Sequence, residues 1–414
     1  AAVARGLTKF VGRSNEIQAL KEAYERAKSG SGQVVGVVGE AGVGKSRLII
    51  ELQHIIPEGE YTYLEGRSLH YGKATAYLPI LDIVRTFFDI QENDNELVIQ
   101  KKLQEKLLQI NEQFQIKLSS FQDLLSIEVY DEKYPHLDSG QKRVRIFEAI
   151  RDLFVCESEQ RPVVLTIEDL HWIDKTSEEF LSYLIDWLAN THILLILLYR
   201  PEYNHNWGSK SYYNMIGVKQ LSPNNSTELV KAILEGGEVV PDLNDLILGK
   251  AGGNPFFVEE LTHSLKENGL IQIKDQQNVL NEKVSEILLP DTIQGIIAAR
   301  IDRTEEKLKQ IMQVASVVGR EFAFRILKSI MGMSEELKTR LLELQGLEFI
   351  TEKRLFPELE YIFKHALTQE VAYNSLLKKH RKEIHEKIGA AIKLLYSDRL
   401  EEYFELLAYH YGHS

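Results

Sequence analysis

The chain has 414 residues, too many for one compact core, so we expect two to four domains. Its formal net charge of −12 argues against a general nucleic-acid or anionic-membrane binder, because both partners select basic surfaces. The single cysteine, Cys156, excludes an internal disulfide bond and fits a reducing cytoplasm. No apolar run approaches the roughly 20 residues needed to cross a bilayer, so we expect no membrane partner.

The first 200 residues alternate between helical and strand patterns. Residues 14–28 have the period of an amphipathic helix, with Ser14 as its expected N-cap. Residues 34–38 form a short β-branched run, typical of a strand buried on both faces of a parallel sheet. Three similar runs follow, at 61–65, 163–167 and 193–198. The sequence therefore predicts a doubly wound α/β domain, with a helical insertion at 90–127.

The pattern changes after residue 222. Residues 224–285 hold short helical stretches. Residues 290–378 hold several helices closed by a β-hairpin with Pro357 in its turn, the arrangement of a winged helix. From His380 onward the helical period returns over two helices, which suits the start of a helical repeat array.

The strongest motif follows the first buried run. It fits G-x-x-x-x-G-K-[ST], the P-loop pattern, and consists of Gly39, Glu40, Ala41, Gly42, Val43, Gly44, Lys45 and Ser46. The glycines let backbone N–H groups wrap a phosphate chain, and the helix that begins here, with Arg47 in its first turn, adds its positive dipole end. Lys45 would reach the β- and γ-phosphates of ATP, and the Ser46 hydroxyl would ligate Mg²⁺.

A P-loop requires an acidic partner at the end of a neighbouring strand. The hydrophobic run 163–167 ends in Glu168 and Asp169. One of these carboxylates would bind Mg²⁺ through water and the other could orient the attacking water, and the sequence leaves open which does which.

Residues 168–174, with the sequence EDLHWID, resemble the Walker B region of the STAND class, the signal-transducing ATPases with numerous domains. These proteins are relatives of AAA+ ATPases. The resemblance is to the bacterial branch, whose ATPase module follows a class III adenylate or guanylate cyclase domain or lies in large LuxR-type regulators. It extends over nearly the whole chain, with its motifs in the family's order.

Four further elements carry the resemblance. Val11, Gly12 and Arg13 are similar to the element that touches adenine with its backbone, and Arg200 follows the strand after Walker B, where the family places a γ-phosphate sensor. A guanidinium at that edge can make a forked contact to phosphate oxygens. Pro255 is similar to the lid proline that packs on adenine, and His365 to the histidine that contacts the ADP β-phosphate and holds a closed state.

The resemblance implies an α/β P-loop domain followed by an all-helical lid, a winged helix and the start of a helical repeat. The expected boundaries are a linker at 1–8, the P-loop (AAA-like) domain at 9–222, the lid at 223–286, the winged helix at 287–378 and a TPR-like repeat at 379–414. Residues 5–8 are similar to the joint after a cyclase domain, and both chain ends suggest a fragment of a longer protein.

The resulting hypothesis is a cytoplasmic, Mg²⁺-dependent ATPase that switches between ADP and ATP states, self-associates on activation and regulates an upstream, cyclase-like effector. Many relatives carry two Asp in Walker B, whereas Glu168 stands first here, so slow hydrolysis is expected. No second Arg can be named as a trans-acting finger, although Arg143 and Arg145 precede the strand that ends in Glu168.

Two alternatives remain open. The winged helix could bind DNA, but its candidate recognition helix, residues 335–344, carries three Glu against two basic residues and lacks the basic face that a groove reader needs. The complete protein could instead be a nucleotide cyclase of which this chain is the regulatory segment, although no residue here could perform cyclase chemistry.

Overall fold

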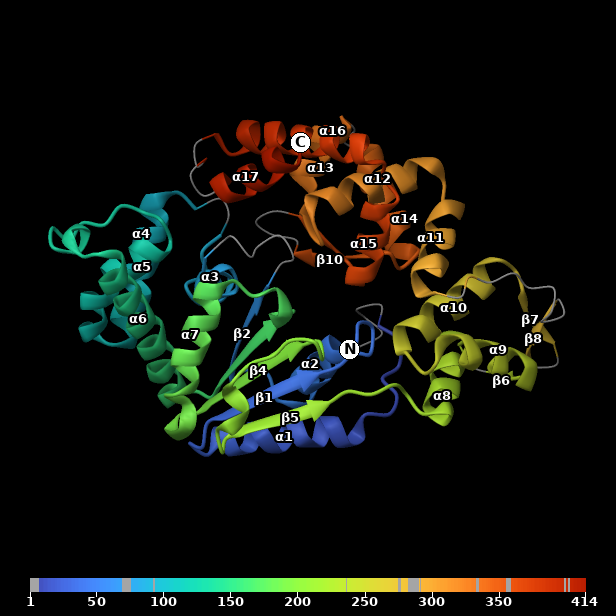
Figure 1. The fold of residues 1–414 in the computed structure, drawn as a ribbon, viewed down its shortest axis with the longest axis horizontal. Helices are drawn as coiled ribbons and strands as arrows, with labels where there is room; N and C mark the ends of the chain where they lie inside the picture. Colours follow the sequence, from blue (N-terminus) through green and yellow to red (C-terminus); the bar gives the residue numbers. More distant parts are fainter. Residues whose placement is uncertain are drawn as a thin grey trace. The chain divides into compact units, whose positions relative to one another are not determined.

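A computed structural model describes residues 7–68, 76–91, 94–235, 237–274, 277–281, 290, 292–332, 335–354, 359–397, 400 and 403–414. Residues 1–6 of the expected linker, the segment around the expected boundary at 286, and Pro357 lie outside this set. The chain forms two compact units (Figure 1). The sheet unit comprises 13–40 and 44–219, and the helical unit comprises 1–12, 41–43 and 220–414. The finer expected boundaries stay predictions.

The sheet unit is built on five parallel strands in the order β2-β3-β4-β1-β5 (Figure 1). The strands are β1 (Gln33–Val38), β2 (Thr62–Arg67), β3 (Val163–Glu168), β4 (Ile193–Tyr199) and β5 (Tyr213–Gly217). The four predicted strands are confirmed to within one or two residues. β5 was not predicted, because it is an edge strand in which only Ile216 is buried.

Helices cover both faces of this sheet. The helices are α1 (Ser14–Lys28), α2 (Lys45–Ile55), α3 (Leu78–Phe87), α6 (Ser139–Gln160) and α7 (Lys175–Ile185). α1 packs on β1, β4 and α2, whereas α6 packs on β3, β4 and α7. Every residue of β3 and β4 is buried, which explains their uninterrupted apolar runs. α1 has the predicted bounds, but its N-cap is Arg13 in the left-handed region, at φ 65°, rather than Ser14.

The predicted insertion is helical. It holds α4 (Glu96–Ile110), the 3-10 helix η3 (Glu112–Lys117) and α5 (Leu118–Leu124), and α5 packs against α6. Leu103, Leu107 and Phe121 are fully buried and join the apolar core that also holds the inner face of β3. The insertion is therefore part of the hydrophobic core of the sheet unit.

The helical unit begins with three helices and a small sheet. The helices are α8 (Pro223–Ile233), α9 (Pro241–Ala251) and α10 (Pro255–Glu267), and the short strands are β6 (Glu238–Val239), β7 (Ile271–Lys274) and β8 (Gln277–Leu280). α10 packs on both α8 and α9. The expected all-helical lid therefore differs from the structure by the β7–β8 hairpin, whose strands are too short and too exposed to show a strand period.

The rest of the unit surrounds a second apolar core. Its helices are α11 (Ile293–Arg303), α12 (Glu306–Val318), α13 (Phe324–Met331), α14 (Glu335–Gly346), α15 (Ala366–Asn374), α16 (Lys378–Leu395) and α17 (Phe404–His413). β10 (Ile350–Arg354) and β11 (Glu360–Phe363) form the expected hairpin, to which β9 (Glu321–Ala323) adds a third strand. The winged-helix and repeat assignments stay predictions. Within the described residues, no helix is long and apolar enough to cross a membrane.

Gly66 allows the close approach of β2 and α3. A Cβ atom at this position would lie 2.0 Å from the carbonyl oxygen of Pro79. We predict that Gly66→Ala destabilises the sheet unit by about 3 kcal/mol, because backbone atoms cannot move aside as a side chain can. Gly217→Ala is the matched control, since a Cβ atom there meets nothing within 4 Å. Thermal unfolding of both variants checks the prediction, which equal midpoints would contradict.

His385 and His410 form a buried pair between α16 and α17, with their Nδ1 atoms 2.8 Å apart. Burial, followed by the charges of His413 and Arg381, lowers the pKa of His385 to about 4. Burial, followed by the charges of His385 and His413, lowers the pKa of His410 to about 3. Below about pH 6.5 the unfolded chain binds protons that these folded rings do not. Stability should therefore fall as the pH decreases from about 6.5 toward 4, by about 1.4 kcal/mol per pH unit for each ring.

Urea unfolding at a series of pH values measures this slope. His410→Leu should reduce the pH dependence of the unfolding free energy by about 1.4 kcal/mol per pH unit, the contribution of one ring, whatever its effect on stability at neutral pH. An unchanged slope in the variant would show that His410 is not kept neutral by the fold.

Candidate functional site

The P-loop motif joins β1 to α2 as the sequence predicts. Gly42 and Gly44 adopt left-handed backbone angles, with φ of 76° and 101°, that side chains rarely tolerate. Gly44 is the N-cap of α2 and has no side chain with which to bond the first N–H groups of the helix. The loop therefore has the open helix N-terminus and the glycine turns that a phosphate cradle requires. Ser46 lies in the first turn of α2, whereas Arg47 turns to Glu51, 2.8 Å away.

Lys45 is held inside its own loop. Its Nζ atom donates hydrogen bonds to the carbonyl oxygens of Gly39 (2.7 Å) and Glu40 (3.0 Å). Burial lowers the pKa of Lys45, the carboxylate of Asp169 opposes that shift, and Arg200 adds to it. Because β4 pairs with both β1 and β3, the loop that follows β1 and holds Lys45 lies at the edge of the sheet where β3 and β4 end.

Glu168 and Asp169 end β3 in different environments. Glu168 is buried and accepts two contacts from Arg67, at 2.8 Å from Nη2 and 3.1 Å from Nε. Asp169 adopts a left-handed conformation, at φ 53°, and begins the 3-10 helix η5 (Leu170–Trp172). Arg67 is a site residue that the sequence did not reveal. It meets Glu168 only because β2 and β3 pair in the register that aligns these two residues.

Arg200 directly follows β4, whose neighbours are β1 and β3. Its charge acts on both Lys45 and His171. His171 is the second residue that sequence reasoning missed. Burial lowers its pKa to about 4, the carboxylate of Asp169 opposes the shift, and the cations of Arg200 and Lys45 add to it. The imidazole is therefore neutral at physiological pH.

The two arginines considered as trans-acting fingers lie in α6. Arg143 is paired with Glu179 of α7, with 2.9 Å between Nη1 and Oε2, on an exposed part of the sheet unit. Arg145 lies in the same helix, where its charge opposes the rise in the pKa of Tyr134 that burial causes. Neither arginine is assigned to the site.

The N-terminal element is divided between the two units. Val11 is buried in the apolar core around α8, α9 and α10. Gly12 lies against Asn225 of α8, so closely that a Cβ atom would be 2.6 Å from Nδ2. Arg13 belongs to the sheet unit, where it pairs with Glu16 at 3.1 Å and donates to the carbonyl oxygen of Lys219.

The tip of the P-loop, residues 41–43, contacts the N-terminus of α10. Asn254 caps α10 through Oδ1, which accepts from Phe257 N, and its Nδ2 donates to Ala41 O at 3.0 Å. The next contact is from Phe256 N to Gly42 O, at 3.3 Å. Pro255 is the first residue of α10, where a missing N–H is tolerated. The loop tip and the predicted lid proline are thus neighbours within the helical unit.

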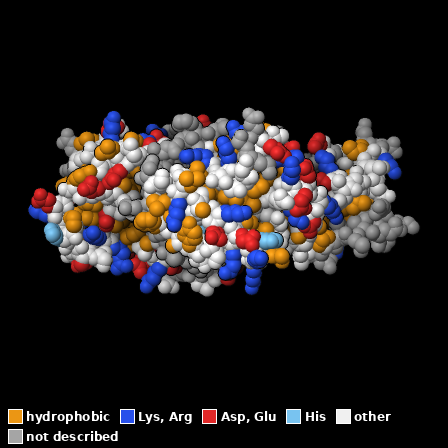
Figure 2. Space-filling view, turned by 90° about the horizontal axis from the view of Figure 1, so that it is seen from above, with side chains coloured by type: hydrophobic (Ala, Val, Ile, Leu, Met, Phe, Trp, Pro, Cys, Tyr) orange, Lys and Arg blue, Asp and Glu red, His pale blue; other side chains and the backbone are white. Residues whose placement is uncertain are grey.

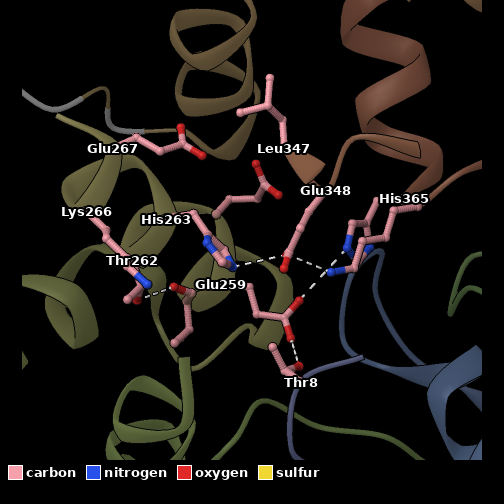
Figure 3. Close-up of polar contacts among 12 residues, drawn as sticks. Thr8, Glu259, Thr262, His263, Lys266, Glu267, Leu347, Glu348 and His365 are labelled. Carbon is pink, nitrogen blue, oxygen red and sulfur yellow. Dashed lines mark hydrogen bonds and ion pairs between the residues drawn. The ribbon is translucent and has the colours of Figure 1, made fainter. Parts of the chain in front are cut away.

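His365 is the N-cap of α15 and stacks on Phe256, with ring centroids 3.7 Å apart and planes at 30°. Its Nε2 atom lies 3.9 Å from Oε2 of Glu259, which also accepts a hydrogen bond from Thr8 (Figure 3). Burial lowers the pKa of His365 well below its usual value, and the cations of Lys364, Arg320 and Arg300 lower it further. The ring is therefore neutral and packed beside the N-terminus of α10.

Buried charges connect α10 to the strands beyond α14. Arg300 contacts both oxygens of Glu260 at 3.1 Å and pairs with Glu267 at 2.7 Å, and it donates to the carbonyl oxygen of Leu347 at 2.6 Å. Glu348 lies 3.3 Å from Nε2 of His263 and 2.8 Å from Nζ of Lys364 (Figure 3). Arg300 and Glu260 are both buried, so loss of either one would leave an unpaired buried charge, at a cost of about 3–5 kcal/mol; this contact therefore holds α10 and α11 in one arrangement.

The structure brings the predicted residues together in two sets. Lys45, Ser46, Glu168, Asp169 and Arg200 converge at the carboxyl edge of the sheet. The second set lies in the helical unit and consists of Val11, Gly12, the loop tip 41–43, Pro255 and His365. Their roles toward a nucleotide stay predictions.

Two family profiles match parts of the chain. A family profile described as an AAA ATPase domain matches residues 9–196, and one described as a domain of unknown function matches residues 222–279. An uncharacterized protein of Rhizobium meliloti (strain 1021) is 23% identical over 399 residues, which is 92% of this chain and 37% of that protein.

Among solved structures, the chain resembles the crystal structure of a Signal Transduction ATPase with Numerous Domains (STAND) protein with a tetratricopeptide repeat sensor from Pyrococcus horikoshii. The TM-score is 0.55 at 15% identity, with 98% of this chain and 48% of that chain covered. A Drosophila ORC structure bound to DNA matches at a TM-score of 0.36, 11% identity and 88% and 87% coverage, a likeness too weak to support an argument.

The chain spans about a third of the curated relative and about half of the STAND protein. The profile match covers the strands and loops that hold Lys45, Glu168 and Asp169, and the structural likeness extends over the helical unit as well. The chain therefore contains an AAA-type P-loop ATPase domain and has the fold of a STAND-class ATPase.

Proposed function

We propose that this chain is a nucleotide-dependent signalling switch, which binds ADP and ATP and hydrolyses ATP slowly. The observation that carries the proposal is the convergence of Lys45, Asp169 and Arg200 beside the glycine loop. The electrostatic interaction of Lys45 with both other groups supports this convergence. A cation in a glycine cradle, an acidic strand end and an arginine on the next strand are the groups that bind and polarise a nucleoside triphosphate with Mg²⁺.

The contacts of Glu168 support a division of labour between the two carboxylates. Glu168 is held by two contacts from Arg67 and is buried, whereas Asp169 begins η5 beside Lys45. We assign Asp169 to Mg²⁺, together with the hydroxyl of Ser46, and Glu168 to the water that attacks the γ-phosphate. A carboxylate already engaged by a guanidinium is a weaker partner for water, which supports slow turnover.

The contacts of the loop tip supply a route from nucleotide to conformation. The carbonyl oxygens of residues 41 and 42 accept hydrogen bonds from Asn254 and Phe256 at the N-terminus of α10. His365 stacks on the ring of Phe256. A bound phosphate chain that changes the backbone of this loop would alter the hydrogen bonds to the N-terminus of α10 and, through Phe256, the packing of His365. ADP would favour the closed arrangement and ATP an open one, since a ligand shifts a population only through contacts that differ between states.

The chain would act within a longer protein. The P. horikoshii STAND protein carries a tetratricopeptide repeat sensor. By analogy we propose that this module couples a sensor to an effector, which could be an upstream cyclase-like domain near Thr8, and that it self-associates in the ATP state. Thr8 donates to Glu259, which lies beside His365, so the start of the described chain is connected to the proposed closing contact.

DNA binding by the predicted winged helix is less well supported. Leu337, Leu341 and Leu344 of α14 are buried, and Arg340 is paired with Glu305 and Glu343, at 2.6 and 2.9 Å. On the face drawn in Figure 2, Lys and Arg side chains lie among Asp and Glu side chains. Paired basic residues do not provide the positive face that phosphate contacts require.

Lys45→Ala tests nucleotide binding. We expect the unaltered chain to bind both ADP and Mg·ATP, and the variant to lose affinity for both by roughly 10- to 100-fold, because a charge-assisted hydrogen bond to phosphate is removed. Lys101→Ala is the control, since Lys101 is exposed on α4. Isothermal titration measures the affinities. An unaltered chain that binds neither nucleotide would rule the proposal out.

Glu168→Gln and Asp169→Asn should separate the two carboxylate roles. We expect Glu168→Gln to lower the rate of phosphate release at saturating ATP about tenfold or more, with ATP affinity changed less than twofold. The unaltered chain should bind ATP more tightly with Mg²⁺ than with EDTA, and Asp169→Asn should reduce this difference in affinity. If Asp169→Asn left the Mg²⁺ effect intact and Glu168→Gln abolished it, the assignment would be reversed.

A further inference from the structure

His171 occupies a fixed position beside the proposed triphosphate site. It is the middle residue of η5, which follows Asp169 directly and packs against β4. Leu170 on one side is fully buried and Ile173 on the other is 8% exposed, so the segment is anchored at both ends. The imidazole itself lies against Trp172, with ring centroids 5.0 Å apart and planes at 45°. The backbone thus holds this ring at the carboxyl edge of the sheet.

The charges that face the ring come from three segments. They are Asp169 at the end of β3, Arg200 and Glu202 after β4, and Lys45 in α2. Because η5 follows the end of β3 and packs against β4, His171 lies at the edge of the sheet where these two strands end. On the proposed function, that is the side where the last phosphate of ATP would lie.

Both ring nitrogens lack a hydrogen-bond partner within the part of the chain that the structure describes. Nδ1 and Nε2 of His171 are each buried from solvent and unpartnered. A buried polar group without a partner destabilises a fold by about 1–3 kcal/mol, so such a group is expected to gain a partner in a functional state. The tilted contact with Trp172 accounts for the ring's packing, but a phenyl ring could make the same contact and would carry no unpaired nitrogen.

We propose that His171 is a specificity-determining residue that donates a hydrogen bond from its ring N–H to an oxygen of the γ-phosphate of ATP. At least one ring nitrogen carries a proton in either charge state, so a donor is always present. The other nitrogen can accept a hydrogen bond from water at the same phosphate. This inference rests on the proposed nucleotide switch and adds a contact that ATP makes and ADP does not. His171 thereby biases the site toward the triphosphate.

The test compares affinities for ADP and for a non-hydrolysable ATP analogue, each with Mg²⁺, by isothermal titration. His171→Phe keeps a flat ring and removes both nitrogens, and His171→Gln restores a donor. His136→Phe is the matched control, because His136 is exposed in the 3-10 helix at residues 134–136. We expect His171→Phe to weaken binding of the ATP analogue roughly tenfold or more, because a hydrogen bond to a charged group is lost, and to weaken binding of ADP less than twofold. His171→Gln should recover part of the loss.

The ratio of the two affinities distinguishes the outcomes. An unchanged ratio in both His171 variants would overturn the inference, and so would an equal loss for both nucleotides, which indicates a structural role. If His171→Phe does not fold, the test relies on His171→Gln compared with the unaltered chain. The inference then requires that His171→Gln lose affinity for the ATP analogue and keep its affinity for ADP. An unaltered chain that binds neither nucleotide would overturn the proposed function itself, whereas normal binding with an unchanged ratio would overturn only the role of His171.

Discussion

The parallel pairing of β3, β4 and β1 is the constraint on which the candidate site depends. β4 lies between the other two strands, and all three run in the same direction. Their carboxyl ends therefore meet at one edge of the sheet, where Gly39, Asp169 and Arg200 each follow a strand directly. Both faces of a parallel sheet are covered by helices, so its strands are apolar throughout. The charged residues therefore follow directly where each apolar strand ends, at the carboxyl edge of the sheet. The parallel pairing of β4 with β1 brings Arg200 to the edge of the sheet at which the P-loop begins.

Much of this architecture could be predicted because its signals are local. The apolar runs of β1, β3 and β4 mark strands without reference to the rest of the chain, and the P-loop pattern places Lys45 by spacing alone. Arg67 could not be found in this way, since its contact with Glu168 depends on the register between β2 and β3. His171 was within a recognised motif, but its unpaired nitrogens become visible only when the neighbouring segments are in place. β5 was missed because an edge strand buries too few residues to show a pattern.

The proposed switch rests on the contacts of the loop tip. Two backbone carbonyls of the tip accept hydrogen bonds from Asn254 and Phe256, and the ring of Phe256 is covered by His365. The charged contacts of Arg300 and Glu348 then connect α10 to α11 and to the segment before β10. Buried ion pairs of this kind favour a few discrete arrangements over continuous deformation, since a partly separated pair is costly. Under the proposed switch, a change in the loop backbone would therefore move whole helices.

Hydrogen exchange of the purified chain in ADP and in a non-hydrolysable ATP analogue tests the switch most directly. The proposed closed state predicts stronger protection with ADP at two segments, the first turn of α10 (residues 254–258) and the start of α15 (residues 365–369). Weaker protection of both segments is expected with the ATP analogue, whereas β3 and β4 should exchange equally in both. If the two nucleotides gave the same protection at residues 254–258 and 365–369 while both were bound, the chain would be a nucleotide-binding ATPase module without the switch.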